Sequence, residues 1–482
     1  MRRSLLILFA KQVVRNALFN KAVLVLLGVI ALLLVYAGYS GARIHSDQTA
    51  NRIKYQREVR SHWENMPDKH PHRMAHYGYI AFRPKHPLSV FDFGIESYTG
   101  NAVFLEAHKQ NSVNFSEAGF SSGMLRFGEI SIAMILQVLL PLVIFFIGFS
   151  TVATDRENGT LKILLSQGAT WKEIIFGKMT GLLAIALPVL LFAMLVLVMC
   201  GFLFSSLSFG MDEWLRTLLI TLSYMIYLTV VSLLAVLLSA VSKTARLALI
   251  SLIGVWLLLV VILPRASQAA GSALFPSLSK IEFEAGMESD LIKKGDSHDP
   301  NDPYYKALKD SLMKVYRVDS IVQLPFNYSG FQMKEGERVS AEIYQQHLLA
   351  LLNNYKRQNS VSRVVAFVNP FAAQRNLSMA LSGTDFNTYS WFQQQAEGYR
   401  YHLAQQMNEL QIKLISNRRP AQHEAPHSIS REHWKAFPDF VYQRPSLGKV
   451  LGDELLSLTA LLLWVFMLVV LVSIISKKLK AV

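Results

Sequence analysis

Six long apolar runs interrupt an otherwise polar chain. A helix needs about 17 or more predominantly apolar residues to cross a bilayer, and each run reaches that length. The runs are Ala22–Tyr39, Ile130–Phe149, Gly181–Phe204, Leu218–Val241, Leu247–Leu263 and Leu455–Ile475. We therefore predict an α-helical integral membrane protein with six transmembrane helices.

Two long polar segments, at about residues 40–129 and 264–454, separate some of these runs. The first carries short alternating or aromatic runs at Tyr77–Phe82 and Ala102–Leu105, bounded by turn signals. Such a pattern is typical of mixed structure. The second segment has no such alternation and is expected to be mostly helical.

Two stretches of the second segment repeat apolar residues every three or four positions. One is Ala341–Val368, and the other begins after Asp385, which can cap a helix, and continues to about Ser416. This spacing predicts two long helices that pack as an antiparallel pair. The two polar segments together predict one mainly helical (α+β) extracytoplasmic domain built from two insertions.

The first 20 residues are expected to form an amphipathic helix at the membrane surface. Lys11, Gln12, Arg15 and Asn16 share one stripe, while apolar residues share the other face. A basic amphipathic helix lies in the interface with its charges towards the lipid headgroups. The alternative is an ordinary basic flank of the first span.

A polar hairpin, residues 151–178, joins the second and third apolar runs. Gly159 completes an Asn-Gly turn, and Thr160 is expected to cap a short helix over Leu161–Gln167. Gly168 is expected to end that helix. A short helix with well-defined ends at the membrane surface suits the docking of a partner protein.

The helix that follows also has a clear start signal. Thr170-Trp-Lys-Glu173 has the spacing of a capping box, in which each side chain bonds the backbone of the other residue. The hairpin therefore leads directly into the third apolar run.

Positive charge predicts the orientation of the six spans, because cytoplasmic loops are enriched in Lys and Arg. The basic residues that flank the spans are Arg2, Arg3, Lys11, Arg15, Lys21, Arg156, Lys162, Lys172, Lys178, Lys243, Arg246, Lys477, Lys478 and Lys480. Six alternating spans put all of them on one side and the acidic loop at Asp212 and Glu213 on the other. Both termini are therefore expected in the cytoplasm.

These observations give a linear order of parts. We expect an interfacial helix (1–20), a first transmembrane helix (21–39), a first insertion (40–129), transmembrane helices two to five (130–263) with the cytoplasmic hairpin, a second insertion (264–454), and a sixth transmembrane helix with a basic tail (455–482).

Composition excludes several classes of protein. The chain of 482 residues is 52% hydrophobic with mean hydropathy +0.28, which fits spans combined with sizeable polar parts. Its net charge of +14 follows the membrane pattern rather than a basic face, so nucleic-acid binding is not expected. The only cysteine, Cys200, allows neither an intramolecular disulfide nor a cysteine metal site.

Motifs for catalysis or nucleotide binding are not found in the sequence. Phe176-Gly-Lys178 and Leu447-Gly-Lys449 lack the upstream glycine and the following Ser or Thr of a phosphate-binding loop. We therefore expect no ATP site, no cofactor and no enzymatic activity in this chain.

Five histidines, His62, His70, His72, His76 and His86, lie close together in the first polar segment. Metal binding needs ligands that converge and a supporting outer shell. The proline and cations around His70 and His72 argue against tight ligation. A solvated polar loop is the favoured interpretation, and no metal site is predicted.

Some polar residues fall within the apolar runs. Ser and Thr at such positions usually join helices by hydrogen bonds. Gln137, Tyr224 and Tyr227 are the candidates for lining a pathway, because the amide of Gln137 is hard to satisfy within its own helix.

The hairpin resembles a known loop. Asp155-Arg-Glu157-Asn-Gly-Thr160-Leu, Leu164-Leu-Ser166, Lys172-Glu-Ile and Gly177-Lys178 are similar to the loop between spans two and three of ABC-2 type transporter permeases. The resemblance implies a coupling helix that docks into a groove of a cytoplasmic ABC ATPase subunit. The implied coupling residues are Asp155, Arg156, Glu157, Gly159, Thr160, Leu161, Lys162, Leu164 and Gly168.

The two insertions set this chain apart from a plain permease of that type. It resembles the branch with two large extracytoplasmic insertions through Ala75-His-Tyr-Gly78, Pro87-Leu, Glu106-Ala-His-Lys-Gln110 and Gly383-Thr-Asp385. The resemblance implies ATP and Mg²⁺ bound by the ATPase subunit, a second permease copy or paralogue, contact with membrane lipids, and room for a periplasmic or outer-membrane partner.

The function expected from these patterns is that of a permease subunit in the bacterial inner membrane, with export as the favoured direction. The alternative is an ATP-independent, membrane-anchored periplasmic receptor or scaffold, for which the hairpin would be dispensable.

Overall fold

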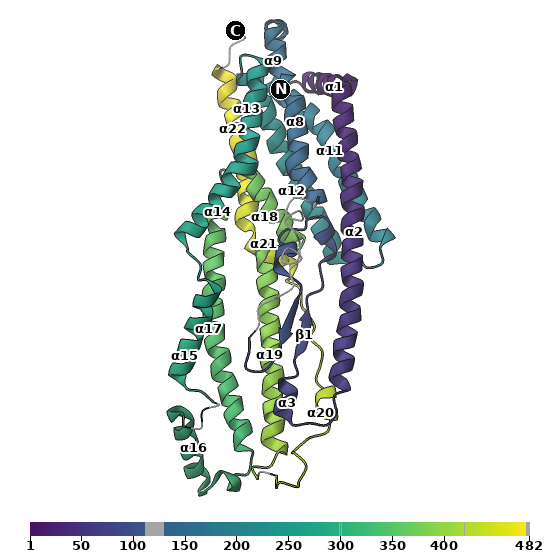
Figure 1. The fold of residues 1–482 in the computed structure, drawn as a ribbon. Coiled ribbons are helices and arrows are strands. Elements are labelled where there is room, and N and C mark those ends of the chain that lie inside the picture. The colour runs from purple at the N-terminus through teal and green to yellow at the C-terminus, as the bar shows by residue number, and fades with distance from the viewer. Residues whose placement is uncertain (111–129, 298, 300, 419, 479–482) are drawn as a thin grey trace.

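In the part of the chain that the structure describes, six helices are long and apolar enough to cross a membrane, the count expected from the sequence. The computed structural model describes residues 1–110, 130–297, 299, 301–418 and 420–478. The six helices are Lys21–Glu64, Ile132–Glu157, Trp171–Leu203, Met211–Val241, Ala245–Leu274 and Leu455–Lys478. They come together in the upper half of Figure 1, from which Lys21–Glu64 continues far downwards beside an elongated second part.

Several of these six are built from more than one helical element. The second comprises α7 (Ile132–Met134), the π-helical turn η2 (Ile135–Leu139), α8 (Leu140–Gly148) and α9 (Ser150–Glu157). The fifth comprises α13 (Ala245–Leu257), the π-helical turn η3 (Leu258–Ile262) and α14 (Leu263–Leu274). The others are single helices: α2 (Lys21–Glu64), α11 (Trp171–Leu203), α12 (Met211–Val241) and α22 (Leu455–Lys478).

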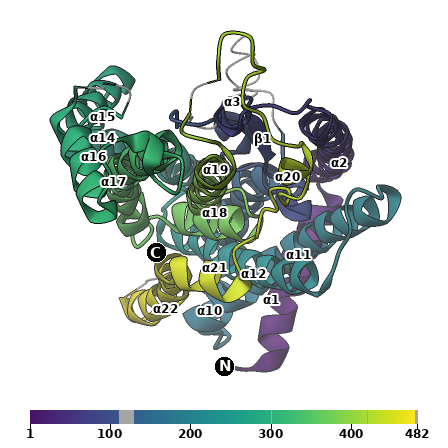
Figure 2. The same ribbon diagram turned by 90° about the horizontal axis from the view of Figure 1, so that it is seen from below.

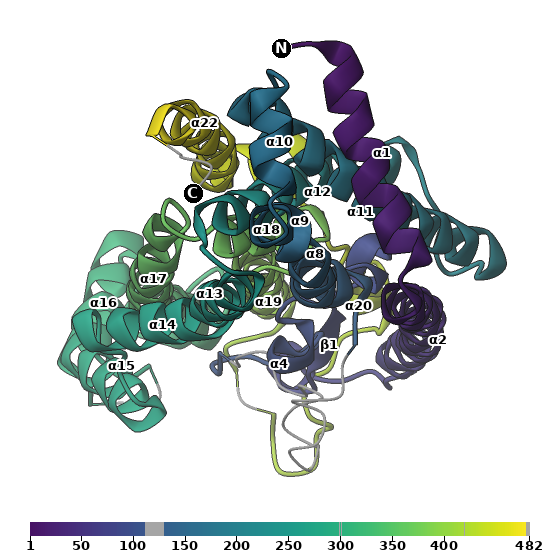
Figure 3. The ribbon, with the colours of Figure 1, turned by 90° about the horizontal axis from the view of Figure 1, so that it is seen from above.

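Helix α1 (Arg3–Phe19) lies across the end of the bundle and over α11, as Figure 3 shows. Its buried residues are Phe9, Val13 and Ala17. Two glycines of α11 make room for them. A Cβ at Gly177 would lie 2.7 Å from Phe9 Cβ, and one at Gly181 would lie 2.7 Å from Val13 Cβ. The predicted amphipathic helix is present, and its apolar face packs on protein.

Helix α2 continues well past the first apolar run, through 44 residues in all. The first insertion, expected to have mixed structure, begins with helix, because residues 40–64 continue α2, and its two strands follow at the alternating runs singled out from the sequence. The polar half favours helix through pairs four residues apart, such as Arg60 and Glu64, whose Nε and Oε1 atoms lie 2.5 Å apart. No proline falls between the apolar run and the end of the helix.

Helix α18 (Pro370–Leu381) is an element that the sequence patterns did not predict. It follows α17 (Tyr328–Val365) and packs between α12 and α22, within the core formed by the apolar helices. The Asn369 side chain caps its first turn. A segment of the second polar insertion thus returns into the bundle, at the level where α18 is labelled in Figure 1.

The lower part of the molecule is called the distal domain here: the C-terminal half of α2, residues 65–110, 276–368 and 386–446. Its long axis is α17 packed antiparallel on α19 (Phe386–Leu414), as the three- and four-residue spacing predicts. Asp385 caps α19 as expected, accepting hydrogen bonds from Asn387 N and Thr388 N. Figure 2 shows α19 near the centre, with α17 on one side and α2 on the other.

One apolar core, which includes a small sheet of the first polar segment, connects the two polar segments. Strands β1 (Tyr79–Phe82) and β2 (Ala102–Leu105) pair antiparallel, with Tyr79 opposite Leu105. Trp63 from the first segment and Trp434 from the second are both fully buried in the same core, and Trp63 Nε1 donates to Trp434 O at 2.9 Å. The two segments therefore fold as one unit.

Shorter elements complete the described chain. They are α3 (Pro71–Ala75), η1 (Pro87–Val90), α4 (Glu96–Thr99), α10 (Thr160–Ser166), α15 (Lys280–Lys294), α16 (Pro303–Tyr316), η4 (Ile321–Gln323), α20 (Glu432–Lys435) and α21 (Leu447–Asp453).

Candidate functional site

The coupling hairpin, residues 151–178, has two glycines where the sequence predicted turns. Gly159 and Gly168 have φ of +76° and +85°, values that residues with a Cβ rarely adopt. The expectation that Thr160 caps α10 is wrong: Gly159 is the N-cap residue, and no side chain caps this end. Thr160 is instead the first helical residue.

The first arm of the hairpin is helical as far as Glu157, and its charged residues bond inward. Asp155 forms an ion pair with Lys178 of α11. Arg156 donates to the carbonyl oxygens of Ala240, at 2.6 Å, and Ser242 at the end of α12. Glu157 accepts from Ala245 N at the start of α13, at 3.0 Å. These three predicted coupling residues tie the hairpin to the helices behind it.

Helix α10 has one face on the protein and one face in the open. Leu161 is fully buried, and Leu164 is half-buried against the same core. Lys162 is exposed, and 57% of Ile163 is exposed even though its side chain is a large aliphatic one. The sequence analysis did not single out Ile163, although its position beside Lys162 follows from helical periodicity.

The second arm begins with the capping box that the sequence predicted. Thr170 Oγ1 accepts from Glu173 N at 3.3 Å, and Glu173 Oε2 accepts from Thr170 N at 3.0 Å. Glu173 also pairs with Arg2, with Nη2 and Oε2 3.0 Å apart, and Arg2 donates to the Gly168 carbonyl. The start of α1 is thereby fastened to the hairpin.

The three candidate pathway residues meet inside the bundle as one buried hydrogen-bonded cluster. Gln137 Nε2 donates to Tyr224 OH at 2.6 Å, and Tyr227 OH donates to the Gln137 carbonyl at 3.0 Å. Tyr224 OH lies 3.1 Å from Ser378 Oγ on α18, and Ser378 donates to Asp92. The cluster therefore joins α12, η2, α18 and the segment after η1.

Two members of this buried cluster, Asp92 and Ser378, were missed by the sequence analysis. They are 286 residues apart, so no local pattern brings them together. Burial raises the pKa of the Asp92 carboxyl above its usual value, against the hydrogen bonds from Ser378 and the Gly94 backbone.

A polar cavity of about 270 Å³ lies where the distal domain meets the bundle, between α17, α18, α19 and α21. Lys356, Arg363 and Lys449 contribute positive charge to its lining, and Asp385 and Asp453 contribute negative charge. Burial raises the pKa of Asp385. Such a lining can hold a small polar molecule. The cavity lies beside α18, which contributes Ala380 to its lining.

A buried ion-pair network crosses the distal domain. Arg400 of α19 lies 2.7 Å from Glu337 of α17, and it pairs with Glu397 through two hydrogen bonds of 2.8 Å. Burial raises the pKa of Glu337, but the hydrogen bond from His108 and the charge of Arg400 outweigh it and hold the pKa below its usual value. The two long helices are thus joined by charge as well as by apolar packing.

The five histidines of the first segment do not form one solvated loop. His86 is buried, and its Nδ1 accepts from Leu88 N, while His70 caps α3 through His72 N. His62 is exposed on α2. Only His72 and His76 stay together, and His108 joins them.

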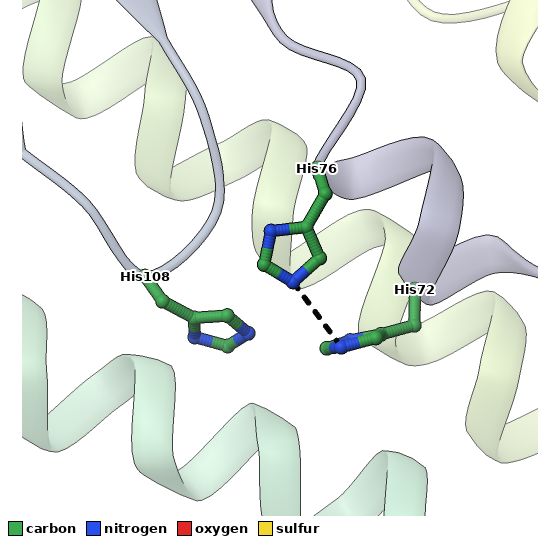
Figure 4. Close-up of side chains that lie close together, drawn as sticks. All are labelled: His72, His76 and His108. Atoms are coloured by element: carbon green, nitrogen blue, oxygen red, sulfur yellow. Dashed lines mark hydrogen bonds between the residues drawn. The ribbon is translucent and has the colours of Figure 1, made fainter.

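The resulting histidine cluster, His72, His76 and His108, is shown in Figure 4. One nitrogen of each ring lies within 4.8 Å of the others, and His72 Nε2 and His76 Nε2 are 3.2 Å apart. A second grouping of metal-ligating residue types comprises His86, Asp212 and Glu213. There Asp212 pairs with Arg216 at 2.6 Å and Glu213 with Arg444 at 3.1 Å, so it is an ion-pair network.

Comparison with known families gives two partial matches. A model described as "Domain of unknown function (DUF3526)" matches residues 280–443, which cover α18 and much of the distal domain. A model described as "Protein of unknown function (DUF2705)" matches residues 98–295, which include spans two to five. No curated protein matches the chain. Neither description states an activity, so the functional argument depends on geometry.

Proposed function

We propose that this chain is the permease subunit of an ATP-driven transporter of the bacterial cytoplasmic membrane. It couples ATP hydrolysis by a separate cytoplasmic subunit to the movement of a substrate, in the export direction by preference. The observation that carries the proposal is the coupling hairpin: it is bonded at its base to α12, α13 and the start of α1, and it exposes an apolar and basic surface at its tip.

The arrangement of charge supports cytoplasmic termini. The start of α1, the hairpin and the end of α22 all lie at the same end of the molecule in Figure 1. The flanking Lys and Arg residues of the sequence belong to these segments and to the α12–α13 turn. Since cytoplasmic loops are the basic ones, this end faces the cytoplasm and the distal domain is extracytoplasmic.

The exposed face of α10 suits an ATPase groove. A docking site needs an apolar anchor that becomes fully desolvated, together with polar groups at its rim. Ile163 is the anchor, and Lys162 and Gln167 are rim residues, all three exposed in this chain. Asp155, Arg156 and Glu157 have a different role, because their side chains carry force from α10 to the helices behind it.

The contacts of the hairpin define a route for that force. Arg156 holds the end of α12, and Glu157 holds the start of α13. Along α12, Tyr224 bonds Gln137 of η2 and contacts Ser378 of α18. Because α18 connects α17 to α19, a displacement of α10 reaches the distal domain through α12 and α18.

The partners follow from this arrangement. The ATPase subunit binds ATP and Mg²⁺, while this chain binds neither. A second copy or a paralogue completes the translocation unit, and lipids cover the remaining apolar faces. Of the six apolar helices, Ala245–Leu274 is the least buried, which leaves a face for that second subunit. The distal domain is available to a periplasmic or outer-membrane partner.

The test is co-purification of the tagged chain from its native membrane in mild detergent, followed by identification of partners and an ATPase assay. The proposal expects an ABC ATPase subunit that hydrolyses ATP in the complex. A chain that purifies alone and inert contradicts it and favours the membrane-anchored receptor, for which the hairpin has no partner.

A further inference from the structure

The histidine cluster of the distal domain converges from two separate segments. His72 belongs to α3 and His76 directly follows it, so a spacing of four places both rings on one helix face. His108 comes from the turn after β2, and its far ring nitrogen points towards the other two rings in Figure 4. His72 and His108 are half-buried, while His76 is exposed, so the cluster opens to solvent on one side.

The spacing of the nitrogens fits one particular ligand geometry. A tetrahedral Zn²⁺ ion with Zn–N bonds of about 2.0 Å separates two ligand nitrogens by about 3.3 Å. His72 Nε2 and His76 Nε2 are 3.2 Å apart. Three imidazoles leave the fourth tetrahedral position for water or another ligand, as in open zinc sites.

The third histidine is held as a metal ligand usually is. Glu337 Oε2 lies 3.2 Å from His108 Nδ1 and also accepts from His108 N at 3.1 Å. A carboxylate that binds Nδ1–H fixes the tautomer that carries its lone pair on Nε2 and raises the basicity of the ring. Glu337 is itself fully buried and paired with Arg400, so this orienting group has little freedom to move.

The backbone at His108 is in an uncommon conformation that the surroundings enforce. Its φ is 59°, in the left-handed region that non-glycine residues rarely occupy. Glu106 and Lys109 bridge across the turn, and Arg400 donates to the Glu106 carbonyl at 3.3 Å. Strain of this kind persists where the structure over-determines it and concentrates at functional sites.

Three cations near the cluster have partners of their own. Lys109 lies 3.6 Å from the Glu106 carboxylate, and Lys69 lies over the Tyr77 ring. Arg400 is neutralised by Glu337 and Glu397. Arg73, which follows His72 in the chain, is exposed to solvent, where its charge is screened.

We propose that His72, His76 and His108 bind one divalent transition-metal ion of the Zn²⁺ class, with Glu337 as the orienting partner of His108. Imidazole ligands favour Zn²⁺ and its neighbours over Mg²⁺ and Ca²⁺. The ion fastens α3 to the turn after β2 and, through Glu337, to α17. The site is independent of the transport proposal, because it uses only residues of the distal domain.

The test is titration of the purified, chelator-treated full-length protein with Zn²⁺ against a competing metal indicator. The expected result is one Zn²⁺ per chain, no competition by equimolar Mg²⁺, and a rise in the unfolding temperature on Zn²⁺ addition. His76→Ala, at an exposed position, is expected to abolish both signals, and His62→Ala, an exposed histidine outside the cluster, to preserve them.

A second variant tests the orienting role. Glu337→Gln keeps all three ligands and is expected to weaken Zn²⁺ binding about 10- to 100-fold. Wild-type protein that binds no Zn²⁺, or His76→Ala protein that binds it as tightly as wild type, overturns the proposal. In that case the 3.2 Å contact of His72 and His76 is an ordinary hydrogen bond between imidazoles.

Discussion

The coupling hairpin and the distal domain are held together in opposite ways. In the hairpin, the capping box joins residues three apart, and Asp155 and Lys178 are 23 apart. In the distal domain, His108 and Glu337 are 229 apart, and Arg60 and Asp439 are 379 apart. The hairpin leaves its apolar tip open, whereas the distal domain buries the ion pairs of Arg400. Under the proposed function, this difference suits a tip that an ATPase subunit grips and a distal domain that moves as one unit.

The largest effect is a loss of stability, expected in the distal domain when the buried ion pair of Arg400 and Glu337 is broken. Arg400→Ala leaves Glu337 buried without its cation and is expected to cost about 3–5 kcal/mol of stability. The matched control is Arg338→Ala, whose surface pairs with Glu335 and Glu342 are worth about 0–1 kcal/mol. Unfolding followed by the fluorescence of Trp63 and Trp434 measures both. Equal losses for the two variants would show that the distal domain does not depend on this network.

A smaller effect, confined to docking, is expected at the tip of the hairpin. Ile163→Asp places a charge on the proposed anchor and is expected to weaken ATPase binding by about 2 kcal/mol, or roughly 30-fold. Stability is expected to stay within about 0.5 kcal/mol, because the side chain is exposed. Val315→Asp, at a position 71% exposed on α16, is the control and is expected to leave binding unchanged. Retained affinity in Ile163→Asp would remove α10 from the interface.

The smallest effect is expected from the turn that orients α10. A Cβ at Gly159 meets nothing within 4 Å, so Gly159→Ala is penalised only by its φ of +76°. A left-handed alanine costs about 1–2 kcal/mol. The free turn is expected to relax out of this conformation, so docking must restore it and loses roughly 5- to 30-fold in affinity. Gly254→Ala also meets nothing within 4 Å but lies inside α13, and it serves as the control. An unchanged affinity in Gly159→Ala would mean that docking does not need the left-handed turn.

The same difference in sequence separation explains which features could be predicted from the sequence. The six spans, the glycine turns, the capping box and the Asp385 cap depend on neighbours within a few residues, so their patterns are visible in the chain. The hydrogen bonds that hold the C-terminal end of α9 were not predicted. The partners of Arg156 and Glu157 there are Ala240 and Ala245, more than 80 residues away in the chain.

Helix α18 and the distal domain were less predictable, because they too depend on contacts between residues far apart in the chain. Helix α18 is short, carries Gln374 and Ser378 and is followed by Ser382, so its sequence does not indicate a place among apolar helices. Its burial becomes clear only when Tyr224 and Asp92 provide hydrogen-bond partners. Likewise, His108 could be grouped with His72 and His76 only after β2 had been paired with β1.

The most direct test of the central claim is site-specific crosslinking from an introduced cysteine. The single native cysteine, Cys200, is buried in α11, so it does not compete for the label. A cysteine introduced by Ile163→Cys can carry a photoreactive crosslinker in native membranes, and Val315→Cys provides the control on the distal domain. The account predicts a crosslink from position 163 to an ABC ATPase subunit, and none from position 315. A crosslink to that subunit from position 315, or none from position 163 in an active complex, would contradict the coupling role of the hairpin.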